Sequence, residues 1–261
     1  MMRALSFAVS LLSAITVTTA VATTPVEPAP DKLVLKELRH TAPIPDFSSI
    51  KNISIRKQAF IKMIAAHSRP ILHNIEKKRT ILLALYLRYR AGDPLSADEK
   101  EWIMNHARHL EIKQFDSDRH SHWLQVLKRT DSIPLSLLIA QAAIESAWGT
   151  SRFAREGNNY FGIWCSTPGC GIVPKQRADG ATHEVERYPD LHTAIKKYIH
   201  ILNTRSAFEA LRKLRHQQRS NLLSPSGTLL LKGLDLYARN GEHYMSLLEK
   251  IISQNQLGQY D

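Results

Sequence analysis

The sequence predicts a mainly α-helical protein of the α+β class, with one small β-hairpin. Apolar residues recur at helical spacing through most of the chain after residue 50, which is the pattern of amphipathic helices. Only residues 171–188 combine two short runs typical of strands with an Asp-Gly turn signal between them. A chain of 261 residues is long enough to bury an ample core around such helices.

The first 22 residues have the pattern of a cleaved secretory signal. Arg3 supplies a positive charge, residues 4–15 form an apolar run, and residues 20–22 read Ala-Val-Ala, a small-x-small cleavage site. The apolar run is shorter than the roughly 20 residues that span a bilayer. We therefore expect an exported, periplasmic protein without stable membrane insertion after cleavage, in preference to an uncleaved membrane anchor.

A leader and a helical extension are expected to follow the signal. Residues 23–49 begin with a Pro-rich segment, and we expect this leader to be mobile. Residues 50–130 are expected to form a helical N-terminal region, in which Pro70 interrupts or kinks the first helix. Ser96 and Glu99 have the spacing of a capping box, which predicts that a helix begins there.

A helix that is apolar on nearly every side is predicted over residues 133–148. Ser132 is the expected N-cap, Pro134 lies in the first turn, where proline is favoured, and Gly149 is the natural stop. Because its apolar surface extends all round, this helix is expected to lie buried at the centre of the molecule.

A hairpin and further helices are predicted after this central helix. The two strands are expected at residues 171–177 and 182–188, on either side of the Asp179-Gly180 turn. The later helices are predicted at residues 191–203, 207–218, 228–237 and 242–255.

Glu145 fits the apolar pattern of the central helix least. Glutamate is rarely fully buried unless it is paired or functional. Apolar neighbours and the negative end of the helix dipole both disfavour its charged form, so we expect a raised pKa. A carboxyl group that stays protonated near neutral pH is what a general acid needs to protonate a glycosidic oxygen. A glutamate that reaches solvent or pairs with an arginine at a helix end is the alternative.

The residues around Glu145 resemble the glucosaminidase family of peptidoglycan hydrolases, which has a lysozyme-like fold. The resemblance is carried by residues 140–149, Ala-Gln-Ala-Ala-Ile-Glu-Ser-Ala-Trp-Gly, and residues 157–163, Gly-Asn-Asn-Tyr-Phe-Gly-Ile. It extends over about residues 131–255 and places a catalytic domain at 131–261. It implies a hydrolase, an endo-β-N-acetylglucosaminidase, that cuts the β-1,4 linkage after N-acetylglucosamine in peptidoglycan.

The resemblance also implies roles for individual residues. Glu145 takes the place of the catalytic acid, and Tyr237 takes that of a late active-site tyrosine. Asn159 and Phe161 are placed at the floor of the cleft, and Gln141 lies one helical turn before Glu145 on the same side. Tyr237, Asn159, Phe161 and Gln141 are therefore the expected substrate-binding residues. As alternatives, Asn159 fits a turn residue that bonds local backbone, and Tyr237 fits core packing.

The second acid of the family is harder to place. Family members often carry a glutamate on the hairpin, but the first strand here has none, so Glu184 and Glu186 on the returning strand are the candidates. Each also fits a charged residue on a solvated hairpin face. A single-acid mechanism assisted by the substrate's 2-acetamido oxygen stays open. So do a lytic transglycosylase that gives 1,6-anhydro products and a non-catalytic cell-wall-binding protein.

The net charge and the two cysteines indicate the kind of partner and a disulfide. A formal charge of +11 indicates a polyanionic partner. Export and the lack of a recognisable motif disfavour nucleic acid, so we expect a monomer that binds peptidoglycan glycan strands. Cys165 and Cys170 flank a short loop with Pro and Gly and are expected to form a disulfide. The 12 histidines lack metal-ligand spacing, so neither a metal nor a cofactor is expected.

Overall fold

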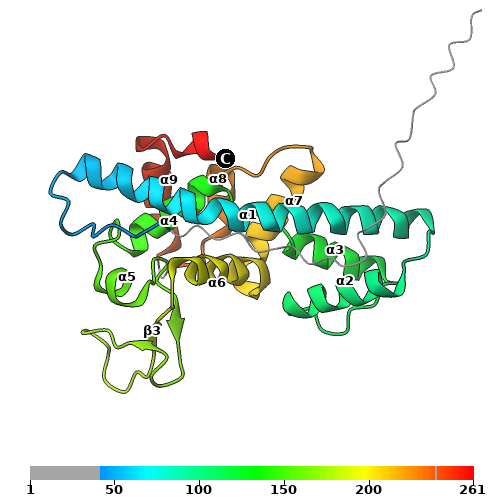
Figure 1. Cartoon of the computed structure of the whole chain (residues 1–261), viewed down its shortest axis with the longest axis horizontal. Coiled ribbons are helices and arrows are strands. Elements are labelled where there is room, and N and C mark those ends of the chain that lie inside the picture. The colour runs from blue at the N-terminus through cyan, green and yellow to red at the C-terminus, as the bar shows by residue number, and fades with distance from the viewer. Residues whose placement is uncertain (1–41, 239) are drawn as a thin grey trace, which may run out of the picture.

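The computed structural model describes residues 42–238 and 240–261 (Figure 1). The predicted signal peptide, residues 1–22, and most of the predicted leader lie outside the described residues. Within the described ranges, no helix has both the length and the apolar character needed to span a bilayer. The fold is mainly helical with one small sheet, which confirms the predicted fold class.

The helices follow one another along the chain, and all three strands lie between α5 and α6. They are α1 (Ile53–Ala91), α2 (Ala97–His109), α3 (His120–Arg129), α4 (Leu135–Glu145), α5 (Arg152–Gly157), α6 (Leu191–Thr204), α7 (Glu209–Ser220), α8 (Gly227–Leu230) and α9 (Gly241–Gln254). Short 3-10 turns lie at η1 (Ser206–Phe208), η2 (Leu231–Gly233) and η3 (Leu257–Tyr260). The single helix predicted over residues 228–237 is therefore wrong, because α8 and η2 end at Gly233 and leave Tyr237 in a turn.

Helix α1 runs along most of the body and contributes to two hydrophobic cores (Figure 1). It is continuous over 39 residues, so the expected interruption at Pro70 does not occur. Proline removes one helical hydrogen bond. The helix tolerates this loss because apolar side chains are buried on both sides of Pro70: Phe60 and Ile64 in the larger core, Leu82 and Leu85 in the second.

The second core joins the end of α1 to α2 and α3. It contains the fully buried Trp123, whose indole N–H donates to the Ser117 carbonyl oxygen at 2.7 Å. Helix α2 begins at the predicted capping box, because the Ser96 side chain accepts the Glu99 amide and the Glu99 carboxylate accepts the Ser96 amide. This N-terminal region therefore has a small core of its own.

A buried charge cluster joins this region to the rest of the molecule. Asp131 is 1% exposed and lies 3.4 Å from the Arg79 guanidinium of α1 and 2.8 Å from that of Arg219 of α7. The fully buried Arg215 approaches the same carboxylate at 3.6 Å and donates to Asn203 Oδ1 of α6 at 2.7 Å. Helices α1, α6 and α7 are thus tied to the segment that leads into α4.

Helix α4 lies at the centre of the larger core, with every residue from Leu135 to Ala143 buried. Its start corrects one prediction: Ser132 is not the N-cap, and its hydroxyl donates to Glu76 instead. The side chain of Asp261 occupies the capping position. It accepts the Ser136 amide at 2.9 Å and the Ser136 hydroxyl at 2.7 Å.

The last residues of the predicted leader also belong to the larger core. Phe47 is 1% exposed, and its ring packs edge-on against Phe60 with the ring centroids 5.4 Å apart. A Cβ added at Gly149 would lie 2.4 Å from the Phe47 ring, so Phe47 fits only because residue 149 is a glycine. The expected mobile leader therefore does not extend to residue 49.

The sheet is antiparallel with the strand order β1-β3-β2. Its strands are β1 (Trp164–Cys165), β2 (Gly171–Ile172) and β3 (Glu184–Glu186). The predicted pairing of two strands is present between β2 and β3, but both strands are shorter than expected and β1 adds a third. The disulfide between Cys165 and Cys170 is confirmed, with a Cα–Cα distance of 6.3 Å.

Candidate active site

Glu145 is the last residue of α4, and its side chain is half-buried. The helix ends three residues earlier than predicted because the backbone turns left-handed, with φ of +48° at Ala147, +57° at Trp148 and +77° at Gly149. The turn is fixed by hydrogen bonds, among them the Gly149 amide to the Ser146 hydroxyl at 2.8 Å. Left-handed backbone is strained for residues other than glycine, such as Ala147 and Trp148, and must be held by the surrounding structure. Such strained residues occur often at functional sites.

Gly162 makes the space that the Glu145 carboxylate occupies. Its φ is +63°, and a Cβ added there would lie 2.5 Å from Glu145 Oε2. Both observations require glycine at this position, because a side chain would be strained and would displace the carboxylate. This role of Gly162 is not evident from the sequence, although the residue lies within the motif at residues 157–163.

Asn159 organises the loop that carries Gly162. The side chain is 1% exposed, and its Nδ2 donates to the Ile163 and Glu186 carbonyl oxygens, both at 2.8 Å. Its Oδ1 accepts the Ile163 amide at 3.2 Å. The expected substrate-binding role is wrong for Asn159, because its hydrogen bonds are made to backbone around Glu145.

A directed chain of hydrogen bonds leads to Glu145 through the core. The Tyr198 hydroxyl donates to Gln141 Oε1 at 2.5 Å, and Gln141 Nε2 donates to the Tyr244 hydroxyl oxygen at 3.0 Å. The Tyr244 oxygen accepts from Gln141, so its own proton is available for the hydrogen bond with the Glu145 carboxylate. Gln141 is 0% exposed and positions Tyr244, which corrects its expected contact with substrate.

Tyr237 and Phe161 pack on the same tyrosines. The Tyr237 hydroxyl donates to the Phe161 carbonyl oxygen at 2.9 Å, and its ring stacks on Tyr244 with centroids 5.4 Å apart. Phe161 is 1% exposed and stacks on Tyr198, so its ring forms part of the core and offers no surface to a substrate. Tyr237 is partly exposed. It lies close enough to Glu145 for the Glu145 charge to raise its pKa, as expected of a tyrosine in the same site.

Burial sets the electrostatics of the site. It raises the pKa of Glu145, and the hydrogen bond from Tyr244 opposes part of that rise. Burial also raises the pKa values of Tyr198, Tyr237 and Tyr244, and the nearby Glu145 charge adds to each rise. The predicted direction for Glu145 is confirmed, and the carboxyl lies among tyrosines that stay neutral donors.

Glu184 has a structural role on the sheet. One of its carboxylate oxygens accepts the Gly169 amide at 3.0 Å, and the other accepts the Gly171 amide at 2.8 Å. These two hydrogen bonds lower the pKa of the Glu184 carboxyl group. Glu184 is 7% exposed. The prediction of Glu184 as a candidate second acid is therefore wrong, since both carboxylate oxygens accept hydrogen bonds from the disulfide loop.

Glu186 lies closer to the tyrosines. After burial, the charge of Glu186 is the main cause that raises the pKa of Tyr188. Tyr188 in turn contributes to the raised pKa of Tyr237, beside Glu145. We refer to Tyr188, Tyr198, Tyr237 and Tyr244 as the tyrosine cluster. Of the two predicted hairpin acids, Glu186 is the one that adjoins it.

The site offers a proton donor and neutral hydrogen-bond donors. In the described ranges, no group of three or more His, Cys, Asp or Glu side chains is arranged to hold a metal ion. The chemistry that these side chains support is proton transfer from Glu145, with the resulting carboxylate stabilised by the Tyr244 hydroxyl.

Comparisons with known proteins show the family to which the chain belongs. Residues 120–257, more than half of the chain, match the family model named Glucosaminidase, described as mannosyl-glycoprotein endo-β-N-acetylglucosaminidase. Protein Bax of Escherichia coli strain K12 is 27% identical over 213 residues, which cover 82% of this chain and 74% of that protein. The catalytic domain of the autolysin Auto from Listeria monocytogenes superposes with a TM-score of 0.43 at 20% identity, over 82% of this chain and 92% of that domain.

Proposed function

Since the chain belongs to the glucosaminidase family, we propose that it hydrolyses the β-1,4 linkage after N-acetylglucosamine in peptidoglycan, with Glu145 as the general acid. The family membership supports a glycoside hydrolase, and the matched region, residues 120–257, contains Glu145 and the whole tyrosine cluster. The observation that carries the role of Glu145 is its half-buried carboxyl group with a raised pKa among neutral tyrosines.

In the proposed reaction, protonated Glu145 gives its proton to the glycosidic oxygen as the bond to the anomeric carbon breaks. The carboxylate left behind keeps its hydrogen bond from Tyr244, whose proton is directed toward it by Gln141. This hydrogen bond stabilises the negative charge of the Glu145 carboxylate. It therefore limits the rise in the pKa that burial causes, so that Glu145 can still release its proton. Burial and the tyrosine together match the acidity of Glu145 to its task.

The anomeric carbon also needs a nucleophile or an activated water on its other face. Glu186 is the hairpin acid that adjoins the tyrosine cluster, and we assign it as the candidate second acid. The substrate's own 2-acetamido oxygen is the alternative. A Glu186→Gln variant that keeps most of the activity would favour the acetamido route, whereas a loss similar to that of Glu145→Gln would favour Glu186.

The charge of the chain supports a wall polymer as substrate. The formal charge of +11, which becomes +10 when residues 1–22 with Arg3 are removed, favours binding to glycan strands whose stem peptides carry carboxylates. Export to the periplasm through residues 1–22 and action as a monomer belong to the same proposal.

Product analysis tests the proposal. Purified peptidoglycan sacculi are digested with the protein, and the released fragments are identified by mass spectrometry before and after borohydride reduction. We expect fragments with reducing N-acetylglucosamine ends. Anhydro-muramic acid ends would instead identify a lytic transglycosylase. Pelleting with sacculi without release of any fragment would identify a cell-wall-binding protein without activity.

A further inference from the structure

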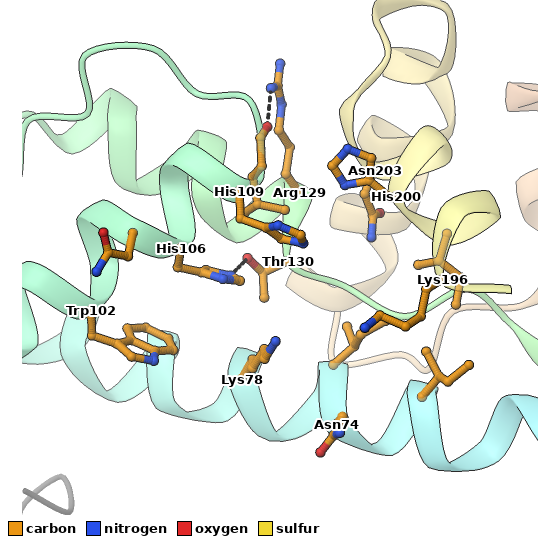
Figure 2. Close-up of a pocket in the computed structure, with 15 residues that line it drawn as sticks. Asn74, Lys78, Trp102, His106, His109, Arg129, Thr130, Lys196, His200 and Asn203 are labelled. Carbon is orange, nitrogen blue, oxygen red and sulfur yellow. Dashed lines mark hydrogen bonds between the residues drawn. The ribbon is translucent and has the colours of Figure 1, made fainter. Parts of the chain in front are cut away.

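A cavity of about 520 Å³ lies between the N-terminal helices and α6, away from Glu145. It is bounded by α1, α2, the end of α3 and the outer side of α6 (Figure 2). None of the residues that line it is Glu145 or a member of the tyrosine cluster. Its volume falls in the range of pockets that hold small organic molecules.

Basic side chains from three helices converge on this cavity. Lys78 of α1, His106 and His109 of α2 and Lys196 of α6 point toward the same space in Figure 2. Arg129 and His200 also line it, and no Asp or Glu is among the lining residues. At the rim, Glu111 accepts a hydrogen bond from His200 at 3.0 Å. The interior is therefore an environment of positive potential.

The remaining wall of the cavity has an apolar part and an uncharged polar part. The apolar part is formed by Ile71, Ile75, Trp102, Leu110 and Ile199, and the polar part by Asn74, Asn105, Thr130 and Asn203. The Trp102 ring stacks on His106 with centroids 5.2 Å apart, so an apolar surface continues directly into the basic group. A ligand that matches both the apolar part and the basic group needs an apolar body and a negative group.

Burial and, after it, the neighbouring positive charges disfavour protonation of His106 and His109. Burial, then the charges of Lys78 and His109, lower the pKa of His106 to about 4. Burial, His200, Lys78 and Lys196 lower that of His109, and Glu111 only partly opposes them. A bound anion would relieve this repulsion, so protonation of the histidines and binding of an anion favour each other.

We propose that this cavity is a binding site for a small amphipathic organic anion, in which a carboxylate, sulfonate or phosphate is attached to an apolar group. The anionic group lies among Lys78, Lys196 and His109, and the apolar group lies against Trp102 and its aliphatic neighbours. The site is independent of the proposed hydrolysis, because it shares no residue with the Glu145 site.

Calorimetric titration of the full chain with benzenesulfonate and with its neutral isostere benzenesulfonamide tests the proposal. We expect benzenesulfonate to bind at least about tenfold more tightly, since the two probes differ by one negative charge near several cations. Phenyl phosphate and phenylacetate, titrated in the same way, distinguish a phosphate from a carboxylate as the preferred anionic group. Equal affinity for benzenesulfonate and benzenesulfonamide would overturn the proposal.

Substitutions locate the binding. Lys78→Met with Lys196→Met is expected to weaken benzenesulfonate binding at least about tenfold. Lys62→Met with Lys100→Met, which removes two exposed lysines from α1 and α2, is the matched control and should leave it unchanged. Lys196 is exposed, so the single Lys196→Met variant keeps the test valid if the double variant unfolds. An equal effect of both double variants would contradict the assignment.

The pH dependence gives a second readout. Benzenesulfonate keeps its charge between pH 8 and pH 5.5, so any change in affinity reports on the protein. The titratable groups around the bound anion are Lys78 from α1, His106 and His109 from α2, and Lys196 and His200 from α6. At the rim lie Glu111 and, from α3, Arg129, whose guanidinium points away from the anion and donates to the Leu110 carbonyl oxygen at 2.8 Å. We expect affinity to rise several-fold as pH falls, with proton uptake on binding. Affinity that falls or stays constant over this range would contradict the linkage.

Discussion

Two glutamates in this molecule show how surroundings decide what a carboxyl group does. Glu145, at the end of α4, is half-buried among tyrosines, and burial raises its pKa. Glu184, on β3, accepts the amides of Gly169 and Gly171, and these bonds lower its pKa. The first carboxyl is suited to give up a proton, and the second stays ionised and holds a loop.

The difference comes from both burial and partners, because burial is the main cause that raises the pKa of Glu145 and backbone hydrogen bonds are the main causes that lower that of Glu184. Glu184 is only 7% exposed, yet two backbone N–H groups satisfy the charge of its carboxylate. Glu145 has the hydroxyl of Tyr244 as partner, and that single neutral donor offsets the cost of burial only in part. Burial and the number of donors around each carboxylate therefore separate Glu184, which stays ionised, from Glu145, the proposed acid.

The largest expected effect follows from removing the proton donor. Glu145→Gln keeps the shape of the side chain but cannot act as a general acid, so we expect release of fragments from sacculi to fall at least about 1000-fold. Glu156→Gln, at an exposed position on α5, is the matched control and should keep the wild-type rate. A Glu145→Gln variant with unchanged hydrolysis would remove the distinction between the two glutamates.

A smaller effect is expected when Glu145 loses its hydrogen-bond partner. Tyr244→Phe should lower the rate about tenfold, because the carboxylate formed by proton transfer is no longer stabilised. Since the Tyr244 bond lowers the pKa of Glu145, its removal should also move the alkaline limb of the pH–rate profile to higher pH. Tyr89→Phe, which removes the hydroxyl that donates to the Asp118 carbonyl oxygen, is the control. A limb that moves to lower pH would contradict this role.

Glu184→Gln should affect the sheet more than the chemistry. The amide can accept with only one oxygen, so one of the two loop amides loses its partner and the disulfide loop loosens. We expect faster hydrogen exchange at Gly169 and Gly171, with activity reduced by less than about tenfold. Activity as low as that of Glu145→Gln would instead place Glu184 in the reaction.

The smallest expected effect is on stability. Because the folded-state pKa of Glu145 is raised, its contribution to stability is present at low pH and is lost as pH rises through that pKa. Glu145→Gln should therefore raise Tm by a few degrees at most at pH 8 and leave it unchanged at pH 4. Thermal unfolding at both pH values measures this, and a lower Tm at pH 8 would contradict it.

Sequence reasoning predicted those features of the fold that depend on neighbouring residues. The capping box of Ser96 and Glu99 and the Cys165–Cys170 disulfide are local and were found as expected. The prediction of Ser132 as the N-cap of α4 is wrong, because Asp261 reaches that position from the other end of the chain. The early end of α4 was missed because Ala147 and Trp148 adopt left-handed backbone that their residue types do not favour.

The same limit applies to the site. The pattern of an acid in an apolar helix identified Glu145 and the direction of its pKa shift. Gln141, Asn159 and Phe161 were expected to touch substrate, but they are buried and position other groups. A one-dimensional motif does not separate residues that act from residues that support them. Tyr244 was missed as the partner of Glu145, since 99 positions in sequence separate them.

The pKa of Glu145 itself tests the central claim most directly. In protein labelled with carbon-13 at the glutamate carboxyl groups, NMR follows Glu145 and Glu184 in one titration, with the Glu→Gln variants assigning each signal. We predict that Glu145 titrates clearly above the usual value of about 4.3 and Glu184 below it. A Glu145 carboxyl that titrates at or below that value would contradict its role as the proton donor.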